Sequence, residues 1–384
     1  MTGLVRVERH RETASGRKRD SYGTEARTRS RAVGRAEVTM WTLIVAVMVC
    51  LSLSGCFERV VEPEDVFGAI RRGDTYSPAS TMIDSWYAVE AIDGQTFAIN
   101  EPKSSQYNTS YLIVGNKRAV MFDAGSSERP AGSKSMRQVA ALYTDTPITL
   151  ILSHFHYDHI YDASSFEDGV TLIDRPEIRA GVKNGLYTIS ALESVDAEAP
   201  PLKVAGFIAD GDMIDLGNRT LDVLNLPGHT TESIVLIDRA RNQAFTGDFV
   251  YKHLGGIIAF APASDLPPYK ANSERLLHVT NADTQFFGAH GIPRFGRDWV
   301  SLMSNELEKI VNGKPEYRYV AHYLTPGIPV RLQQNGDMYI YTTPLVDPSL
   351  FWAKWMLPVV AVFGALVLYL LYRVARLLFV TVRG

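Results

Sequence analysis

SHFHYDH, residues 153–159, places three imidazoles and one carboxylate within six consecutive positions. An apolar, β-branched run comes directly before it, which predicts a buried strand that ends where the cluster begins. In an extended chain His154 and His156 point the same way, whereas Asp158 and His159 begin a helix and face the other side. Neutral imidazole and carboxylate are ligands that zinc prefers, so the stretch predicts two metal ions lying side by side. The alternative is a His-rich surface turn. The chain has only nine His, so finding three of them within six residues beside an Asp disfavours that alternative.

Three later positions repeat this arrangement of an apolar run, a small or turn residue and a ligand. They are His229, Asp248 and His290. Glycine in each segment permits a tight turn that brings the side chain inward. A single His after a strand is usually an ordinary loop residue. Four sites with the same arrangement, in order, predict a two-metal centre.

Taken together, these residues resemble the metallo-β-lactamase-fold hydrolases, with Asp123 in VMFDAG (120–125) as the earliest matching position. The resemblance covers roughly residues 86–344. It implies an α/β fold, the αβ/βα sandwich, and two zinc ions or other divalent transition metals. The implied ligands are His154, His156 and His229 for one ion, Asp158, His159 and His290 for the other, and Asp248 for both. Asp123 would orient a ligand rather than bind a metal itself.

The same residues narrow the branch of the superfamily. Cys50 and Cys56 are the only cysteines and lie far upstream, which excludes β-lactamases with a Cys ligand. Asp248 disfavours the β-lactamases that lack a bridging Asp, and His156 disfavours iron-binding relatives that have Glu there. The hydroxyacylglutathione hydrolase and lactonase branches remain. However, residues 249–253 (FVYKH) lack a Cys-Gly-Arg-type glutathione segment, so the sequence puts glutathione thioesters in doubt as substrates.

The expected activity is zinc-dependent hydrolysis of an ester, thioester or lactone in a small molecule. A hydroxide bound by two metals would attack the carbonyl, with Asp158 orienting the nucleophile and taking up its proton. Tyr157, Tyr251 and His253 are candidate donors to the developing oxyanion, and Lys252 is a candidate contact for an anionic substrate. For each of these four, ordinary packing or exposure is the alternative. A β-lactam hydrolase and an inactive zinc-binding sensory module are the other functions considered, and the full ligand set favours an enzyme.

The turn residues separate segments with helical periodicity from segments with strand periodicity, which predicts an α/β protein. The sandwich arrangement itself is implied only by the family resemblance. Helices are expected near 135–143, at 272–279 and at 299–311. Strands are expected at 111–114, 119–122, 148–152, 171–173, 221–226, 233–237, 242–245 and 284–287.

The N-terminal part predicts export. Residues 1–39 hold ten of the 39 basic and five of the 42 acidic side chains, and are expected to be disordered. Residues 40–56 resemble a lipoprotein-type signal peptide that ends at Cys56, although a signal anchor with an incidental Cys is the alternative. Met1 and Met40 are both candidate start positions. A linker is expected at 57–85 and the globular domain at 86–348.

The C-terminal part predicts a membrane span. Residues 355–372 are eighteen uncharged, mostly apolar residues, which a helix extends over about 27 Å. The expected transmembrane helix is 351–376, with a tail at 377–384. Arg373, Arg376 and Arg383 predict a cytoplasmic C-terminus and a catalytic domain on the extracytoplasmic side of a bacterial plasma membrane. Without its first 55 residues the chain has a net charge of −8, which disfavours nucleic acid as a partner.

Overall fold

A computed structural model describes residues 58–59, 79–195, 199–252, 256–261, 263–291, 294–322, 325, 329–343, 362 and 364–373. The chain divides into two compact units, Met1–Phe57 and Glu58–Gly384, and every described residue belongs to the second. The predicted disordered segment 1–39, signal peptide 40–56 and tail 377–384 lie outside the described residues, as does His253.

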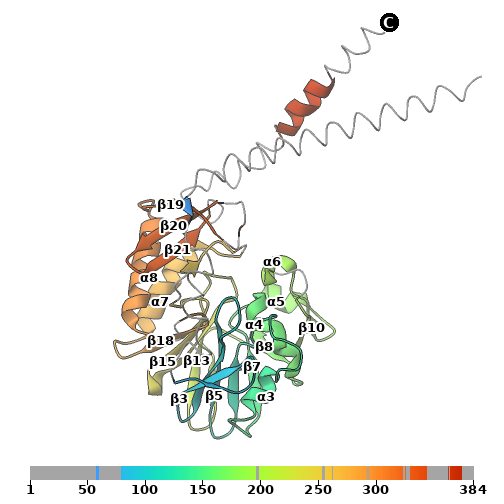
Figure 1. Cartoon of the computed structure of the whole chain (residues 1–384), viewed down its shortest axis with the longest axis vertical. Helices are drawn as coiled ribbons and strands as arrows, with labels where there is room; N and C mark the ends of the chain where they lie inside the picture. Colours follow the sequence, from blue (N-terminus) through green and yellow to red (C-terminus); the bar gives the residue numbers. More distant parts are fainter. Residues whose placement is uncertain are drawn as a thin grey trace, which may run out of the picture. The chain divides into compact units, whose positions relative to one another are not determined.

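Two large β-sheets form the centre of the second unit (Figure 1). The first has the order β2-β3-β4-β5-β6-β7-β8-β11-β10-β9. Its strands are β2 (Thr81–Met82), β3 (Ala88–Asp93), β4 (Thr96–Glu101), β5 (Asn108–Val114), β6 (Ala119–Phe122), β7 (Ile148–Ile151), β8 (Val170–Ile173), β9 (Val182–Lys183), β10 (Leu186–Tyr187) and β11 (Leu202–Ile208). The second has the order β12-β13-β14-β15-β17-β18. Its strands are β12 (Met213–Asp215), β13 (Thr220–Asn225), β14 (Ile234–Asp238), β15 (Gln243–Gly247), β17 (Gln285–Gly288) and β18 (Arg294–Phe295).

Strand β14 shows why the two sheets pack into a sandwich. Ile234 and Leu236 join the core that the second sheet shares with the first, because alternate side chains of a strand point to opposite faces. Val235 and Ile237 join a second core on the other face. Both faces of this strand are therefore buried, and the next two strands of the sheet, β15 and β17, divide their side chains in the same way.

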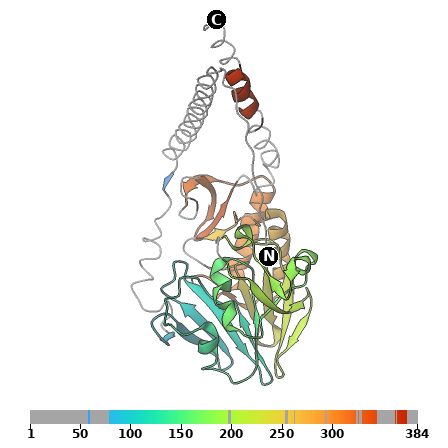
Figure 2. The same cartoon turned by 90° about the vertical axis from the view of Figure 1, so that its right-hand side faces the viewer.

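Helices cover the outer faces of both sheets (Figures 1 and 2). Helices α7 (Leu266–Val279) and α8 (Arg297–Val311) contribute apolar side chains to the second core. Helices α3 (Met136–Ala140) and α5 (Pro176–Gly181) contribute side chains to the core of the first sheet. The layers run helices, sheet, sheet, helices, which is the predicted αβ/βα sandwich.

A third, smaller sheet has the order β1-β19-β20-β21-β16. Its strands are β1 (Glu58–Arg59), β16 (Ile257–Ile258), β19 (Arg318–Ala321), β20 (Pro329–Asn335) and β21 (Met338–Thr342). Val320, Val330, Leu332 and Tyr341 form a small core of its own. The sequence analysis did not predict this sheet, because its strands are short and come from both ends of the domain.

Several boundaries differ from those expected. Helix α7 begins at Leu266 rather than at 272, because prolines occupy its first turn, where a helix tolerates them. Within the segment 57–85, expected to be a linker, β1 pairs with β19 and β2 pairs with β3. Of the expected transmembrane helix 351–376, only residues 362 and 364–373 are described, and these are helical. Among the described residues, no helix combines the length and the apolar character needed to cross a membrane.

Candidate metal centre

The His-rich stretch lies at the carboxyl end of β7, as its sequence predicts. The chain leaves β7 at Ile151, bends at Ser153, is extended at His156 and then forms the short helix α4 (Tyr157–Ile160). His156 is the N-cap of this helix, so Asp158 and His159 fall in its first turn. The change from strand to helix turns the last two side chains away from the direction of the first two.

The remaining ligands come from the second sheet. His229 follows β13, Asp248 follows β15 and His290 follows β17. Strands β15 and β17 are parallel, so their carboxyl ends meet at one edge. Gly247 allows this edge to approach the His-rich stretch, because it has a φ of +50° and a Cβ there would overlap the side chain of Ser153.

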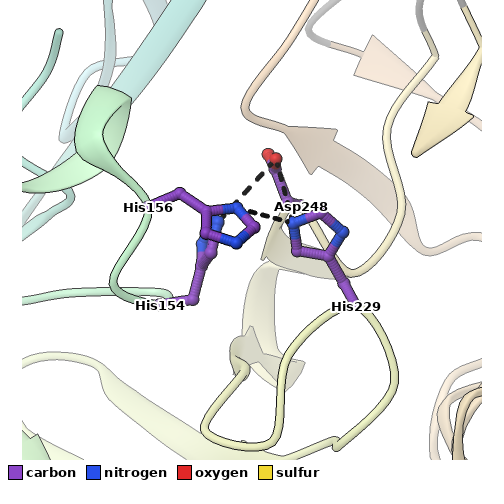
Figure 3. A group of neighbouring side chains, drawn as sticks. All are labelled: His154, His156, His229 and Asp248. Carbon is purple, nitrogen blue, oxygen red and sulfur yellow. Dashed lines mark hydrogen bonds and ion pairs between the residues drawn. The ribbon is translucent and has the colours of Figure 1, made fainter. Parts of the chain in front are cut away.

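The structure brings all seven predicted ligands together in two buried groups. In each group, one ligand atom per residue lies within 4.8 Å of the others. The first group is His154, His156, His229 and Asp248, whose side chains converge from three segments, with His154 and His156 on the same loop (Figure 3). The second group is Asp158, His159 and His290.

Asp248 lies between the two groups. Its Oδ2 is 3.9 Å from Nε2 of His154 and 3.5 Å from Nε2 of His229. Its Oδ1 is 3.5 Å from Nε2 of His159 and 3.0 Å from Nε2 of His290. Oδ2 also lies 3.1 Å from Nε2 of His290, so Oδ1 faces the second group and Oδ2 lies between the two groups. Asp248 therefore contacts both groups, as a bridging ligand must.

Hydrogen bonds at Nδ1 fix the tautomers of four imidazoles. Nδ1 of His229 is 2.9 Å from the carbonyl oxygen of Ile258, and Nδ1 of His290 is 2.9 Å from that of Gln106. A carbonyl only accepts, so in both residues Nδ1 carries the proton and donates.

Asp123 has the same effect on the other two imidazoles. Nδ1 of His159 donates to Oδ2 of Asp123 at 3.0 Å. Ser153 Oγ donates to the same oxygen at 2.9 Å, so this hydroxyl accepts from Nδ1 of His154 at 2.9 Å. In the neutral form, all four rings therefore direct the lone pair of Nε2 towards the centre of the site.

Three buried atoms that face the centre have no hydrogen-bond partner among the described residues. They are Nε2 of His154, Nε2 of His159 and Oδ1 of Asp248, and their neighbours across the site are ionisable groups at 3.0 to 3.9 Å. Leaving a buried polar atom unpaired costs about 1–3 kcal/mol, so such atoms call for an explanation. Such atoms occur in both ligand groups and belong to imidazole and carboxylate side chains, which fits bound metal.

The electrostatics of the site agree with this assignment. Burial lowers the pKa of His154, His156 and His229, and that of His156 falls to about 3, so these rings are neutral as metal ligands must be. Burial also acts to lower the pKa of His159 and His290, but Asp158 and Asp248 outweigh it and raise both pKa values. A positive charge is therefore favoured between these two rings and the carboxylates.

Two amides that the sequence analysis missed hold Asp158. Nδ2 of Asn108 donates to Oδ2 of Asp158 at 3.0 Å and to its backbone oxygen at 2.9 Å. Nε2 of Gln106 donates to the same Oδ2 at 3.2 Å. Neither residue belongs to a recognisable motif, and they reach the site only because the start of β5 lies against α4.

A cavity of about 530 Å³ opens onto the ligands. His156, Asp158, His229 and Asp248 line its floor. Other residues that line it are Gln106, Ser127, Tyr157, Val195, Tyr251, Ile258, Phe260, Ala261 and Thr325.

The predicted substrate contacts fall in different places. Tyr157 lines the cavity, and its hydroxyl accepts from Nε2 of Gln106 at 2.7 Å. Tyr251 also lines it but is buried, and its hydroxyl accepts from the backbone N–H of Ile258 at 2.8 Å. Lys252 is not among the lining residues, and its Nζ lies 4.9 Å from the centre of the Trp299 ring. His253 lies outside the described residues.

Comparison with known proteins places the chain in a family. A family model described as the metallo-beta-lactamase superfamily matches residues 106–322. The chain is similar to the acyl-coenzyme A thioesterase MBLAC2 of Gallus gallus, with 26% identity over 247 residues that cover 56% of this chain and 87% of the relative. It is also similar to the hydroxyacylglutathione hydrolase GloC of Haemophilus influenzae, with 25% identity over 191 residues that cover 48% of this chain and 86% of the relative.

Among solved structures, a metallo-beta-lactamase from Pontibacter korlensis matches with a TM-score of 0.43 and 17% identity, covering 58% of this chain and 99% of the other. The family match spans more than half of this chain and contains both ligand groups. The chain therefore belongs to the metallo-beta-lactamase superfamily and is a metal-dependent hydrolase.

Proposed function

We propose that this chain binds two zinc ions, or two other divalent transition metals, and hydrolyses an ester, thioester or lactone of a small molecule. One observation carries the proposal: seven buried ligands form two groups, and the carboxylate of Asp248 lies between them, in contact with both. Three inward-facing atoms of this set lack a hydrogen-bond partner within the described part of the chain. A single metal would leave one group of ligands without an ion.

When bound, the metals would supply a nucleophile at neutral pH and polarise the carbonyl of the substrate. Asp158 is proposed to hold the attacking water and accept its proton on the carboxylate. It is buried at the floor of the cavity, and the amides of Gln106 and Asn108 fix Oδ2. Among the described residues that line the cavity, only Asp158 and Asp248 carry carboxylates, and Asp248 contacts both ligand groups.

Tyr157 is the better of the two tyrosine candidates for a donor to the developing oxyanion. It begins α4 beside Asp158 and lines the cavity, and the amide of Gln106 orients its hydroxyl. The hydroxyl of Tyr251 instead accepts from the backbone of Ile258. Tyr251 is therefore proposed to support the wall of the cavity, with Tyr157 closer to the chemistry.

The names of two relatives support acyl substrates. One relative is an acyl-coenzyme A thioesterase and the other a hydroxyacylglutathione hydrolase. Residues 249–253 after Asp248 lack the glutathione-type segment, so glutathione itself is the less favoured leaving group. We propose a thioester or ester with another leaving group as the substrate class.

The direct test uses the purified full-length chain in detergent. A panel of one thioester, one lactone and one β-lactam is assayed before and after treatment with a chelator, and again after addition of zinc. We expect turnover of the thioester or the lactone that the chelator abolishes and zinc restores. Tight zinc binding without turnover of any compound would indicate a sensory module instead. Turnover of the β-lactam alone would move the protein to the β-lactamases.

We further propose that the protein is anchored in the bacterial plasma membrane, with the catalytic domain on the extracytoplasmic side. The uncharged stretch 355–372 supports this, and its large apolar side chains at 362 and 366–372 are 40% to 70% exposed. The small sheet gives further support. In the sequence, Cys56 comes two residues before β1, and β21 is the last described strand before the apolar stretch. Both predicted attachments are therefore neighbours, along the chain, of strands of the small sheet.

A further inference from the structure

Part of the cavity wall beside the metal ligands is apolar, whereas Gln106, Ser127 and Thr325 supply polar side chains elsewhere in the lining. Ile258, Phe260 and Ala261 form one side of it, contributed by β16 and the residues that follow. Val195 lies at the cavity from the end of helix α6 (Ala191–Ser194) and is half exposed. No Lys or Arg lines the cavity within the described residues. Such a surface favours a neutral, apolar group over an anionic one.

This wall is fixed to the reacting centre through Ile258. Its backbone oxygen accepts from Nδ1 of His229, and its backbone N–H donates to the hydroxyl of Tyr251. Pairing of Ile258 with Tyr341 in β21 ties the same residue to the small sheet. The position of the apolar wall relative to a metal ligand is therefore set by hydrogen bonds, as selection of a substrate by shape requires.

The small sheet supports the wall from behind. Ile258 and Phe260 pack against its core, and the ring of Phe260 lies 5.3 Å from that of His322. Burial lowers the pKa of His322 to about 4, so this neighbour is neutral and adds no charge behind the wall. The small sheet thus contributes an apolar surface to the cavity.

We propose that the cavity binds the apolar acyl chain of an ester or thioester along Ile258, Phe260 and Ala261, with the carbonyl at the metal ligands. This inference rests on the proposed hydrolase function and specifies its substrate class. Two sources share this chemistry, a soluble acyl thioester and a membrane lipid. A chain lying on the wall buries apolar area in proportion to its length, so specificity for long chains follows.

The first arm of the test is a series of p-nitrophenyl esters from acetate to octanoate, hydrolysed by the zinc-loaded full-length chain in detergent. Burying a methylene stabilises by up to about 0.8 kcal/mol, so even half burial predicts that kcat/KM rises at least about 30-fold from acetate to octanoate. A flat series with measurable turnover would overturn the inference and leave the hydrolase function intact. Absence of turnover with every ester, thioester and lactone would overturn the hydrolase function itself.

The second arm compares Phe260→Ser with Tyr319→Ser in the same detergent, which cancels any partition of the esters into micelles. Tyr319 is an exposed aromatic residue of β19 in the same sheet and does not line the cavity. We expect the octanoate-to-acetate ratio of kcat/KM to fall at least about fivefold in Phe260→Ser, from loss of roughly 1 kcal/mol of apolar contact, and to stay at the wild-type value in Tyr319→Ser. Equal ratios in the two variants would contradict the assignment.

Zinc content shows whether each variant is folded. If Phe260→Ser loses its metal, Ile258→Thr replaces it, because that substitution keeps the backbone contacts of residue 258.

The third arm separates the two sources, using the octanoyl thioester of N-acetylcysteamine in solution and phosphatidylcholine vesicles with the reconstituted chain. Turnover of the vesicle lipid assigns the acyl chain to a membrane lipid. Turnover of the thioester alone assigns it to a soluble substrate. Turnover of neither would overturn the inference.

Discussion

Oδ2 of Asp123 accepts a hydrogen bond from Nδ1 of His159 at 3.0 Å. The same oxygen accepts from Ser153 Oγ, which in turn holds Nδ1 of His154. His154 belongs to one ligand group and His159 to the other. A single buried carboxylate that touches neither centre directly therefore sets the orientation of one imidazole in each.

We predict that Asp123→Asn weakens zinc binding by about 10- to 100-fold, the usual cost of losing a residue that orients a ligand. Asn is the suitable replacement, because Asp123 has a left-handed backbone with a φ of 72°, which Asn tolerates. Competition with a chromophoric chelator measures the affinity. Asp162→Asn is the matched control, since Asp162 is a nearby buried carboxylate that accepts from Arg129 and from the backbone of Met136. Equal affinity in both variants would remove Asp123 from this role.

For Asp158, the prediction concerns turnover. Asp158→Asn keeps the shape of the side chain but removes the negative charge and the proton acceptor. We expect the turnover rate to fall at least about 100-fold, within the range for loss of a general base, with at least one zinc retained. Asn108→Ala should cost less, because the carboxylate remains and loses only one of its donors. Near-normal turnover in Asp158→Asn would contradict the proposed role.

A pH effect on stability is expected from Glu101. It is fully buried and accepts from Nε1 of Trp86 at 2.6 Å and from the backbone N–H of Ser126 at 3.0 Å. Burial raises its pKa from 4.5 to about 8. As the pH rises, the carboxyl group of Glu101 therefore loses its proton at a lower pH in the unfolded chain than in the folded chain. The folded state loses stability between about pH 4.5 and 8 as a result.

Glu101→Gln replaces the ionisable carboxyl group with an amide, so the loss of stability between these pH values should disappear. We expect the unfolding free energy of the wild type, relative to Glu101→Gln, to fall by up to about 1.4 kcal/mol per pH unit within that interval. Urea unfolding of both proteins at several pH values measures the difference. A difference that stays constant with pH would mean that Glu101 has an ordinary pKa.

The proposed topology predicts how a protease and two variants behave. A protease outside the membrane should degrade the domain from His154 to His290 and spare a tag fused after Gly384. Cys56→Ser should block lipid attachment yet leave the protein in the membrane, because an apolar helix anchors more strongly than acyl chains. Deletion of 351–384 should leave a protein held by lipid alone. Appearance of Cys56→Ser in the soluble fraction would show that the C-terminal stretch is no anchor.

The sequence predicted the strands that carry the ligands because they are buried and end at recognisable turns. Strand β6 coincides with its expected range, 119–122, and β7 is shorter than its expected range by one residue. Each ligand follows such a strand closely along the chain, so local pattern was sufficient to find it. The division into two groups came from the family resemblance, since spacing along the chain does not say which loops meet.

Residues that act at the site without a local pattern were missed. Gln106 and Asn108 reach Asp158 across about fifty positions of sequence, through the pairing of Asn108 with His290. The wall at Ile258 and Phe260 depends on a sheet that joins strands from both ends of the domain. Lys252 looked available for a substrate in the sequence, but it packs on Trp299, which follows it by 47 positions. Contacts of this kind require the tertiary structure.

The metal content of the full-length chain and of its Asp248→Ala variant tests the central claim most directly. Asp248 is the residue whose two oxygens face both ligand groups, so its loss should affect both ions. We predict about two zinc ions per wild-type chain and one or fewer in Asp248→Ala, measured by elemental analysis after removal of free metal. Equal metal content in the two proteins, or a wild-type chain that holds only one ion, would contradict the two-metal account.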